Sequence, residues 1–422
     1  MDVLLRAVIA RPTVRWISLA TIGLTLGAIA LRSPRPAQPS TRVAIRVACD
    51  QPRACPLAES LALDVWSEHR GPGLPLDVVV SGDALAALAI AEVGWEVLVP
   101  DIDAVAAAEA ARLHSPAANI AERADWFSDY RDYNAITEHL RELAARAPDR
   151  VSLHAIGTSL ENRPLWALRI GGAPDATPML INGTQHAREW ISAMVTTCVA
   201  DRLVREYDTD LAVRAFVDHT QLWVVPVANP DGYQYSWSTN RYWRKNRRGS
   251  HGVDLNRNWG VAFGGRGSSG SKSAETYRGE YAFSEPESAA LRDLAKRERV
   301  ALHVDFHSYG QLVLYPWSYT GAPARDRDRF AGLGDRVTSA LVAAHDTPYR
   351  LSSGADFYPA AGTMTDWMYG DVGALSYTIE LRPQWPKGAA GFVLPPAQIR
   401  PTCDEGLAAV LALRGVSDRP PR

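Results

Sequence analysis

Residues 178–190 read PMLINGTQHAREW, and this stretch decides which fold the sequence predicts. The apolar run Pro178–Asn182 is typical of a buried strand, a Gly-Thr pair ends it, and a helical pattern begins near Trp190. His186 and Glu189 fall between these two elements. Residues at such a junction project into the cleft at the carboxyl edge of the sheet, where α/β proteins place their chemistry. We therefore predict that both side chains can reach one metal ion.

The same alternation of elements extends on both sides, from Trp126 to about Gly415. Helical patterns cover Tyr133–Ala147 and Trp190–Glu206, and buried-strand runs cover Met179–Asn182, Leu222–Val227, Ala301–Phe306 and Ser376–Leu381. These runs predict an α/β catalytic domain over residues 126–415, with a single mixed β-sheet flanked by helices, and a C-terminal tail over 416–422.

A third metal ligand is expected from another strand end. The run Ala301–Phe306 delivers His307 in that way. Two histidines and one glutamate would leave zinc an open fourth position for water, which is the catalytic rather than the structural arrangement. An isolated strand-end histidine is usually structural, but here the other two ligands are already present.

Two further H-x-x-[DE] pairs occur, and this motif alone is weak because chance produces about one match in a chain of this composition. His139 and Glu142 lie within an amphipathic helical pattern, so we expect them on a solvated helix face. His251 and Asp254 lie in a loop.

Composition excludes several classes of protein. The chain has 422 residues, 46% of them hydrophobic, which is enough to fill real cores and excludes disorder as the dominant state. The formal charge of −2 favours no polyanion partner. The basic, aromatic run Arg241–Arg248 resembles a nucleic-acid patch, but with this net charge we expect no nucleic-acid partner. Four cysteines without a CxxC pair exclude a disulfide framework and a cysteine zinc site.

The N-terminus has the pattern of an export signal. Arg6, Arg11 and Arg15 precede an apolar run, Trp16–Leu31, with small residues near Ala30. The run is shorter than the ~20 residues that span a bilayer, which favours a cleaved signal over an uncleaved anchor in residues 1–31. A linker over 32–41 follows. We expect a secreted or periplasmic protein that contacts the membrane only through this segment, if it stays uncleaved.

Residues 42–113 predict a small separate domain. The expected order is strand Arg42–Val47, helix Leu57–Ala62, strands Leu63–His69 and Leu76–Ser81, helix Asp83–Val93, strand Trp95–Asp101 and helix Asp103–Leu113. A βαββαβ order is ferredoxin-like, an α+β arrangement. Cys49 and Cys55 could form a local disulfide or stay as two small buried residues. Residues 114–125 interrupt the pattern and predict a linker or activation segment.

Several motifs in this order resemble the zinc metallocarboxypeptidases of the pancreatic carboxypeptidase A/B type. They are His186-x-x-Glu189, His307-Ser308-Tyr309, Asn229-Pro230-Asp231-Gly232-Tyr233, Asn240-Arg241-Tyr242-Trp243-Arg244-Lys245, Asp254-Leu255-Asn256-Arg257-Asn258-Trp259, Ala282-Phe283-Ser284-Glu285-Pro286-Glu287, Tyr358-Pro359-Ala360, Asp366-Trp367 and Thr378-Ile379-Glu380-Leu381. The similarity covers essentially all of residues 120–415. Residues 42–113 resemble the activation propeptide of that family more weakly.

The resemblance is highly specific, because many independent motifs occur in the family's order. It implies a secreted zinc carboxypeptidase that binds one zinc per chain through His186, Glu189 and His307. It implies that Glu380 is the general base that takes a proton from the water activated by zinc. It implies that Arg244, together with zinc, stabilises the oxyanion.

Substrate-binding roles follow from the same resemblance. Arg257 and Asn256 are expected to hold the substrate carboxylate, since a guanidinium fork suits bidentate pairing. Tyr358 is expected to close over the bound C-terminal residue. Arg188 is expected to contact upstream substrate, and Tyr309 is grouped with the substrate-binding residues.

Two more residues complete the implied site. Asp254 resembles the carboxylate that holds the His186 imidazole in the required tautomer. Thr365 aligns with the base of the pocket for the C-terminal side chain and, with Ala360, Thr363 and Thr378 as neighbours, implies a neutral pocket that prefers aromatic or aliphatic residues.

The resemblance also implies a zymogen, in which the first domain covers the cleft until an activating protease cuts near residues 112–125, where Arg112 and Arg123 are basic. We expect a monomer that acts on the C-termini of peptides or proteins. Cys198 and Cys403 do not reproduce the disulfide of the pancreatic enzymes, and whether these two thiols meet is left open. Two alternatives are a zinc amidase acting on cell-wall peptides and a non-catalytic secreted binding protein of the same fold.

Overall fold

The computed structural model describes residues 41–67, 74–115, 125–173, 175–385 and 391–416. The predicted signal segment or anchor at 1–31 lies outside these residues, as do nearly all of the linker at 32–41 and the basic residue Arg123. Among the helices of the described ranges, none is long and apolar enough to cross a membrane.

The first part of the described chain forms a small four-stranded sheet. Its elements are β1 (Arg42–Val47), α1 (Ala54–Leu61), β2 (Asp64–Val65), β3 (Leu76–Ser81), α2 (Gly82–Ile90), β4 (Trp95–Val99) and α3 (Ile102–Leu113). All pairs are antiparallel and the strand order is β2-β3-β1-β4. This order of strands is typical of a ferredoxin-like sheet.

The second strand is shorter than predicted. The expected strand Leu63–His69 contributes only Asp64 and Val65 to the ladder. The next two backbone N–H groups, of Trp66 and Ser67, both donate to the carbonyl of Asp77 at 2.8 and 3.3 Å. Two residues that share one partner break the regular ladder, so the strand ends there.

The two faces of the small sheet have different neighbours. Val43, Ile45 and Val47 alternate along β1 and pack in one apolar cluster with residues of α1 and α2. Ala44 points to the opposite face and joins a cluster with Tyr242 and residues of the larger sheet. Alternation with period two thus gives β1 one face for its own core and one face toward the larger sheet. Cys49 and Cys55 form a disulfide with a Cα–Cα distance of 5.3 Å, which decides between the two alternatives for this pair.

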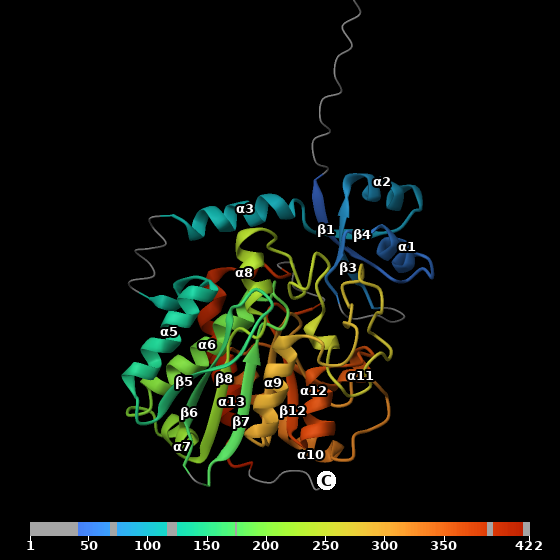
Figure 1. Cartoon of the computed structure of the whole chain (residues 1–422). Helices are drawn as coiled ribbons and strands as arrows, with labels where there is room; N and C mark the ends of the chain where they lie inside the picture. Colours follow the sequence, from blue (N-terminus) through green and yellow to red (C-terminus); the bar gives the residue numbers. More distant parts are fainter. Residues whose placement is uncertain (1–40, 68–73, 116–124, 174, 386–390, 417–422) are drawn as a thin grey trace, which may run out of the picture. The chain divides into compact units, whose positions relative to one another are not determined.

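The larger part is built on one mixed eight-stranded sheet (Figure 1). Its strands are β5 (Val151–Thr158), β6 (Pro164–Gly171), β7 (Thr177–Gly183), β8 (Thr220–Val225), β9 (Leu302–Ser308), β10 (Leu312–Tyr315), β11 (Arg350–Ser353) and β12 (Leu375–Leu381). Their order is β11-β10-β12-β9-β7-β8-β6-β5, and the central strands β12, β9, β7 and β8 are parallel. The predicted mixed sheet is confirmed.

Helices cover both faces of this sheet. They are α5 (Tyr133–Arg146), α6 (Trp190–Arg205), α7 (Leu211–His219), α8 (Pro230–Ser238), α9 (Pro286–Arg297), α10 (Arg327–His345), α11 (Gly354–Phe357), α12 (Met364–Trp367) and α13 (Ile399–Ala412), with short helical turns at Trp126–Ser128, Leu255–Arg257, Met368–Val372 and Pro396–Gln398. Ile181 belongs to the apolar cluster that includes α5, α6, α7, α10 and α13, whereas Leu180 belongs to the cluster that includes α9 and α12. Adjacent strand residues therefore point into two separate cores.

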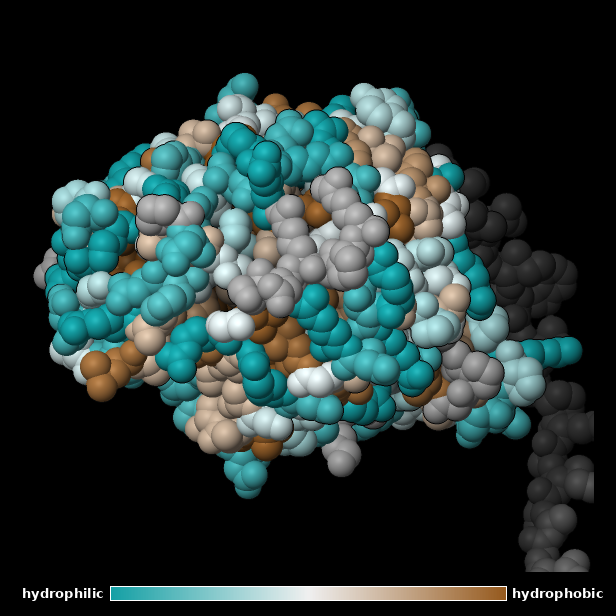
Figure 2. Space-filling view, turned by 90° about the horizontal axis from the view of Figure 1, so that it is seen from below, coloured by the Kyte–Doolittle hydropathy of each residue, from teal (hydrophilic) through white to brown (hydrophobic). Residues whose placement is uncertain are grey.

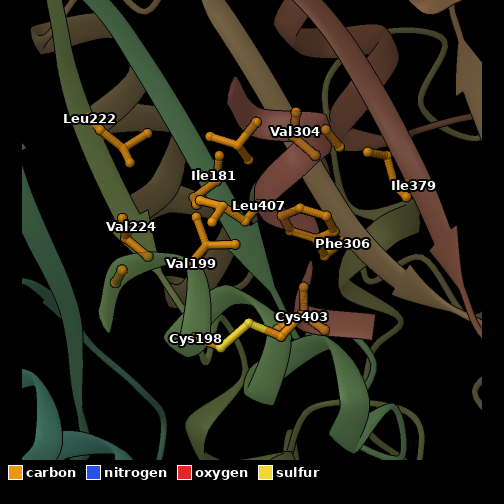
Figure 3. Close-up of a cluster of buried hydrophobic side chains, with 14 of the residues drawn as sticks. Ile181, Cys198, Val199, Leu222, Val224, Val304, Phe306, Ile379, Cys403 and Leu407 are labelled. Atoms are coloured by element: carbon orange, nitrogen blue, oxygen red, sulfur yellow. A yellow bond between two sulfur atoms is a disulfide. The ribbon is translucent and has the colours of Figure 1, made fainter. Parts of the chain in front are cut away.

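A disulfide crosses the first of these cores. Cys198 of α6 and Cys403 of α13 are both buried and are bonded, with a Cα–Cα distance of 6.0 Å. Figure 3 shows this bond beside the apolar side chains of the strands, including Phe306 of β9. The question that the sequence left open for these two cysteines is answered by their pairing.

Strand β9 carries polar side chains on the face of the sheet that points away from the core of α6 and α13. Val304 and Phe306 point into the core of α6 and α13, so the alternate residues His303, Asp305 and His307 share the other face. His307 lies at the carboxyl end of the strand, where the parallel strands β7 and β12 also end. The topology therefore gathers the predicted ligands at one edge of the sheet.

Candidate active site

Three predicted metal ligands converge at the carboxyl edge of the sheet. The Nδ1 atoms of His186 and His307 are 3.1 Å apart, and each lies near a carboxylate oxygen of Glu189, at 2.8 and 3.0 Å respectively. One ligand atom from each residue lies within 4.8 Å of the others, and all three side chains are buried. His186 and Glu189 follow β7 and precede α6, and His307 is in β9, as the sequence predicts.

Buried carboxylates stand behind both imidazoles. Asp254 places Oδ1 3.2 Å from Nε2 of His186, and Asp305 places Oδ2 2.9 Å from Nε2 of His307. Burial favours the neutral form of Asp254, but Arg244, Arg257 and the His186 imidazole hold the pKa of this carboxyl well below its usual range. The carboxylate therefore stays charged and can accept a hydrogen bond from the ring.

The donor set fits a zinc ion. Two imidazole nitrogens and one carboxylate oxygen are the ligands of many catalytic zinc centres, with a further position left for water or substrate. Burial raises the pKa of Glu189, but the neighbouring rings of His186 and His307 lower it below the usual range, so the third ligand is ionised. Three buried polar groups that face one point are explained by a shared cation.

Glu380 lies beside these ligands because of strand register. It is paired with His307 between the parallel strands β12 and β9, so both side chains lie on one face. Glu380, Glu189 and Arg244 line a cavity of about 10 Å³, which has space for a single water molecule. Trp66 of the small domain lines the same cavity and thus narrows the reaction centre.

Arg244 is held close to the ligands. Its Nε and Nη2 atoms donate to Oδ2 of Asp254 at 3.2 and 3.0 Å. Asp254 therefore contacts both the guanidinium and the His186 ring. Arg244 also lines a larger cavity of about 330 Å³ next to the metal ligands.

The larger cavity also contains Arg257 and Tyr358. Arg257 donates from Nη2 to the hydroxyl of Tyr358 at 2.5 Å, from Nη1 to the carbonyl of Asn256 at 2.8 Å and from Nε to the carbonyl of Gly267 at 2.9 Å. Gly267 has a φ of +79°, and a Cβ there would lie 1.9 Å from the carbonyl oxygen of Pro359. A side chain at this position would clash with Pro359, so only glycine can place its carbonyl within hydrogen-bonding distance of Arg257.

Asn256 is turned toward other partners. Its side-chain Oδ1 accepts the backbone N–H of Met364 at 2.9 Å, and its Nδ2 lies 3.4 Å from Nε2 of His307. The residue therefore connects the metal ligands to the start of α12. It lies next to Arg257 in the chain, as the motif predicts.

Two predicted substrate-binding residues contact the small domain. Arg188 donates to Oδ2 of Asp64 at 2.7 Å and to the carbonyl of Val65 at 3.1 Å. The hydroxyl of Tyr309 donates to Oδ2 of Asp77 at 3.0 Å. Burial and this carboxylate raise the pKa of Tyr309 well above its usual value, so the phenol keeps the proton that it donates.

The predicted pocket base is neutral. Thr365 is buried, and its hydroxyl lies 2.6 Å from the hydroxyl of Thr378 on β12. Ala360 and Thr363 are also buried. The adjacent carboxylate, Asp366, accepts the backbone N–H groups of Ser318 and Tyr319 and is used in holding that loop.

The histidine of the motif His139-x-x-Glu142 has surroundings that differ from the expectation. The expectation of a solvated face for His139 is wrong, because its ring is buried, contacts Asp201 at 2.9 Å and stacks on Trp126 with a centroid distance of 4.1 Å.

The basic run Arg241–Arg248 is not an open patch. Arg241 pairs with Glu109, Arg244 with Asp254 and Arg248 with Glu285.

Sequence reasoning missed Asp305 and the groups that hold it. Asn182 and Gln185 donate to its two carboxylate oxygens at 2.7 and 2.6 Å. A signal was available, because Asp305 precedes His307 by two residues in a predicted strand and must share its face.

Comparison with known proteins agrees with this geometry. The family model described as zinc carboxypeptidase matches residues 136–409. The chain is 32% identical over 368 residues to Carboxypeptidase A1 of Mus musculus, covering 84% of this chain and 87% of that protein. It is 36% identical over 293 residues to Carboxypeptidase B of Bos taurus, covering 67% and 70%. The solved structure of thrombin activatable fibrinolysis inhibitor matches with a TM-score of 0.80 and 28% identity, over 88% of this chain and 98% of that one. The chain therefore belongs to the zinc carboxypeptidase family.

Proposed function

We propose that this enzyme is an exported metallocarboxypeptidase that removes neutral C-terminal residues, one at a time, from peptides or proteins. The observation that carries the proposal is one continuous site. The metal ligand Glu189 and the residue Glu380 line the smaller cavity, Arg257 and Tyr358 line the larger one, and Arg244 lines both. A cation beside a hydrogen-bonding tyrosine suits a substrate carboxylate, and a metal centre next to a carboxylate suits amide hydrolysis.

Zinc held by His186, Glu189 and His307 would supply Lewis acidity and would lower the pKa of water toward 7. Glu380 takes the proton that the attacking water loses and later returns it to the leaving amine. Arg244 donates hydrogen bonds to the oxygen of the scissile carbonyl as negative charge develops there.

Arg257 would hold the terminal carboxylate of the substrate. Its guanidinium is fixed by Asn256 and Gly267, which leaves it oriented without further ordering of the side chain. Tyr358 would move with the substrate, since its hydroxyl now contacts the same guanidinium. Asn256 adds a side-chain amide beside the carboxylate.

The neutral pocket supports a preference for uncharged C-terminal residues. The hydroxyls of Thr365 and Thr378 satisfy each other at 2.6 Å, so the pocket base offers neither a charge nor a strong unmet hydrogen bond. An acidic side chain at the bottom of the pocket would be needed to favour Lys or Arg, because a buried cation requires a partner.

We also propose that the chain is made as a zymogen. Asp64 and Asp77 of the small domain contact Arg188 and Tyr309 of the larger domain. Because Arg188 and Tyr309 are predicted to bind substrate, the small domain would occupy part of the substrate site. Arg112 lies within α3 and contacts Asp129, which favours a cut in the segment 114–125 over a cut at Arg112. An exported, monomeric protein that meets its activating protease outside the cytoplasm is consistent with this design and with two disulfides.

Two measurements on the purified full chain test these proposals. Zinc content and the release of single residues from peptides ending in Phe, Leu, Lys and Glu are measured before and after limited proteolysis. We expect one zinc per chain, release that rises after the cut, and higher kcat/KM for Phe and Leu than for Lys. Equal rates before and after the cut would refute the zymogen, and a strong Lys preference would refute the neutral pocket.

A further inference from the structure

A line of polar groups runs behind the metal ligand His307. His303, Asp305 and His307 share one face of β9, and all three are buried. Strand register places Asn182 of β7 beside Asp305. The same register places Ser376 of β12 beside His303. A fully buried strand face that carries only polar groups requires that each group has a partner.

The orientation of Gln185 can be assigned from its partner Trp259. The indole Nε1–H of Trp259, which can only donate, lies 3.1 Å from Oε1 of Gln185. Oε1 must therefore accept, and the amide Nε2 must face Asp305, to which it donates at 2.6 Å. This contact makes Oδ2 of Asp305 an acceptor.

The other oxygen of Asp305 is fixed in a similar way. Asn182 donates from Nδ2 to Oδ1 of Asp305 at 2.7 Å, and its own Oδ1 lies 2.8 Å from Nε2 of His303. Burial lowers the pKa of His303 to about 4, so its ring is neutral and Nε2 carries the single proton. Its Nδ1 then accepts from the hydroxyl of Ser376 at 2.7 Å. Both amides thus point their N–H groups at one carboxylate.

Oδ2 of this carboxylate lies 2.9 Å from Nε2 of His307. The Nδ2 group of Asn256 also faces Nε2, but at 3.4 Å. The shorter contact is to a charged acceptor, which interacts more strongly than a neutral amide at the longer distance. It favours a proton on Nε2 and leaves Nδ1, the atom that faces His186 and Glu189, free to bind a metal.

We propose that Asp305 is a positioning residue that fixes the tautomer and the orientation of His307, and that Gln185 and Asn182 hold its carboxylate for that purpose. The inference rests on the proposed zinc site and deepens it. Asp254 stands behind His186 and Asp305 stands behind His307, so each ligand imidazole has its own buried anion. Such partners increase the basicity of the ligand and strengthen metal binding.

The test measures zinc affinity of the full chain by competition with a chromophoric chelator. Asp305→Asn keeps the shape of the side chain but removes its charge and one acceptor. We expect the zinc dissociation constant to rise about 10- to 100-fold. The matched control is Asp231→Asn. Asp231 is also fully buried and accepts hydrogen bonds from Ser159, Glu161 and Arg163, but it contacts no metal ligand.

A second readout separates positioning from general stability. The cobalt-loaded chain should show a changed visible spectrum in Asp305→Asn and an unchanged one in Asp231→Asn. If Asp305→Asn does not fold, Gln185→Met removes one of the amides that hold the carboxylate and should also raise the zinc dissociation constant. Unchanged zinc affinity in the folded variant, or equal losses in Asp305→Asn and Asp231→Asn, would overturn the proposal.

The outcome does not depend on peptidase activity. If the parent chain binds zinc but releases no C-terminal residues, the proposed function fails. A weaker zinc affinity in Asp305→Asn would still support the positioning role in that case.

Discussion

Glu380 of β12 and His307 of β9 are paired in register between two parallel strands. The distance between the proposed base and the metal ligand is therefore set by the sheet and not by a loop. Because both strands are hydrogen-bonded along their length, the geometry is preorganised before substrate binds.

Glu380→Gln should abolish most of the peptidase activity and leave the metal site intact. A general base contributes about 10²- to 10⁴-fold to the rate, and an amide cannot accept the proton. We expect kcat on a Phe-ended peptide to fall by that factor while the zinc content stays at one per chain. Loss of zinc in the variant would mean that Glu380 acts on the metal and not on the proton.

Arg257→Ala should weaken recognition of the terminal carboxylate. A charge-assisted hydrogen bond contributes about 1.5 to 3 kcal/mol, so kcat/KM should fall at least about 10-fold, chiefly through KM. Arg266→Ala is the control, because Arg266 lines the same cavity but is exposed and makes no side-chain hydrogen bond within the part of the chain that is described. A similar loss in both variants would show that overall positive charge, and not Arg257, recognises the substrate.

Thr365→Asp should change which residue is released. The substitution puts an anion at the pocket base beside Thr378, and a substrate cation would compensate its burial. We expect kcat/KM to rise for Lys-ended peptides and to fall about 10-fold or more for Phe-ended peptides. Thr365→Val is the control that removes the hydroxyl without adding charge. Unchanged preference in Thr365→Asp would place the pocket elsewhere.

Asp64→Ala should raise the activity of the uncut chain. The variant removes the ion pair with Arg188, one of the contacts that hold the small domain at the cleft. A loss of ~1.4 kcal/mol in docking free energy corresponds to a tenfold higher open population. Asp103→Ala is the control, because Asp103 pairs with Arg42 within the small domain. Rates measured after proteolysis should be equal in both variants and in the parent.

Glu287→Gln should flatten the pH dependence of stability. Burial raises the pKa of Glu287 to about 8, and its Oε1 atom has no partner within the described residues. The folded chain keeps this proton while the unfolded chain loses it above about pH 4.3, so stability falls as pH rises from there to about 8. The neutral amide removes that slope, and chemical denaturation at pH 5 and pH 8 measures it. The expected gain at pH 8 is on the order of a few kcal/mol. An unchanged slope would show that Glu287 is ionised in the folded chain.

The main features of the fold and of the metal site follow from local patterns. His186 and Glu189 stand at a strand–helix junction and His307 at a strand end, and both positions can be read from the hydrophobic periodicity. The ends of β1 and α3 also agree with the predicted ranges to within one residue. These are places where a residue's neighbours along the chain decide its structure.

Other features depend on contacts between distant segments. The burial of His139 depends on Trp126 and Asp201, which no helical pattern can reveal. The early end of β2 depends on two N–H groups that share the carbonyl of Asp77. The supporting role proposed for Asp305 needs the register of β7 against β9, because Gln185 and Asn182 are more than 100 positions away in sequence.

The bond between Cys198 and Cys403 has a consequence for where this enzyme can work. It closes a loop with a sequence separation of 205 residues, and in the chain-entropy model such a crosslink lowers the entropy of the unfolded state by an amount worth about 5 kcal/mol. His307 and Glu380 lie within the loop, whereas His186 and Glu189 lie just before it, at the start of the helix that carries Cys198. A reductant would therefore lower the stability of the whole fold that holds these residues together, and the enzyme should lose durability in a reducing compartment well before any catalytic group is chemically altered.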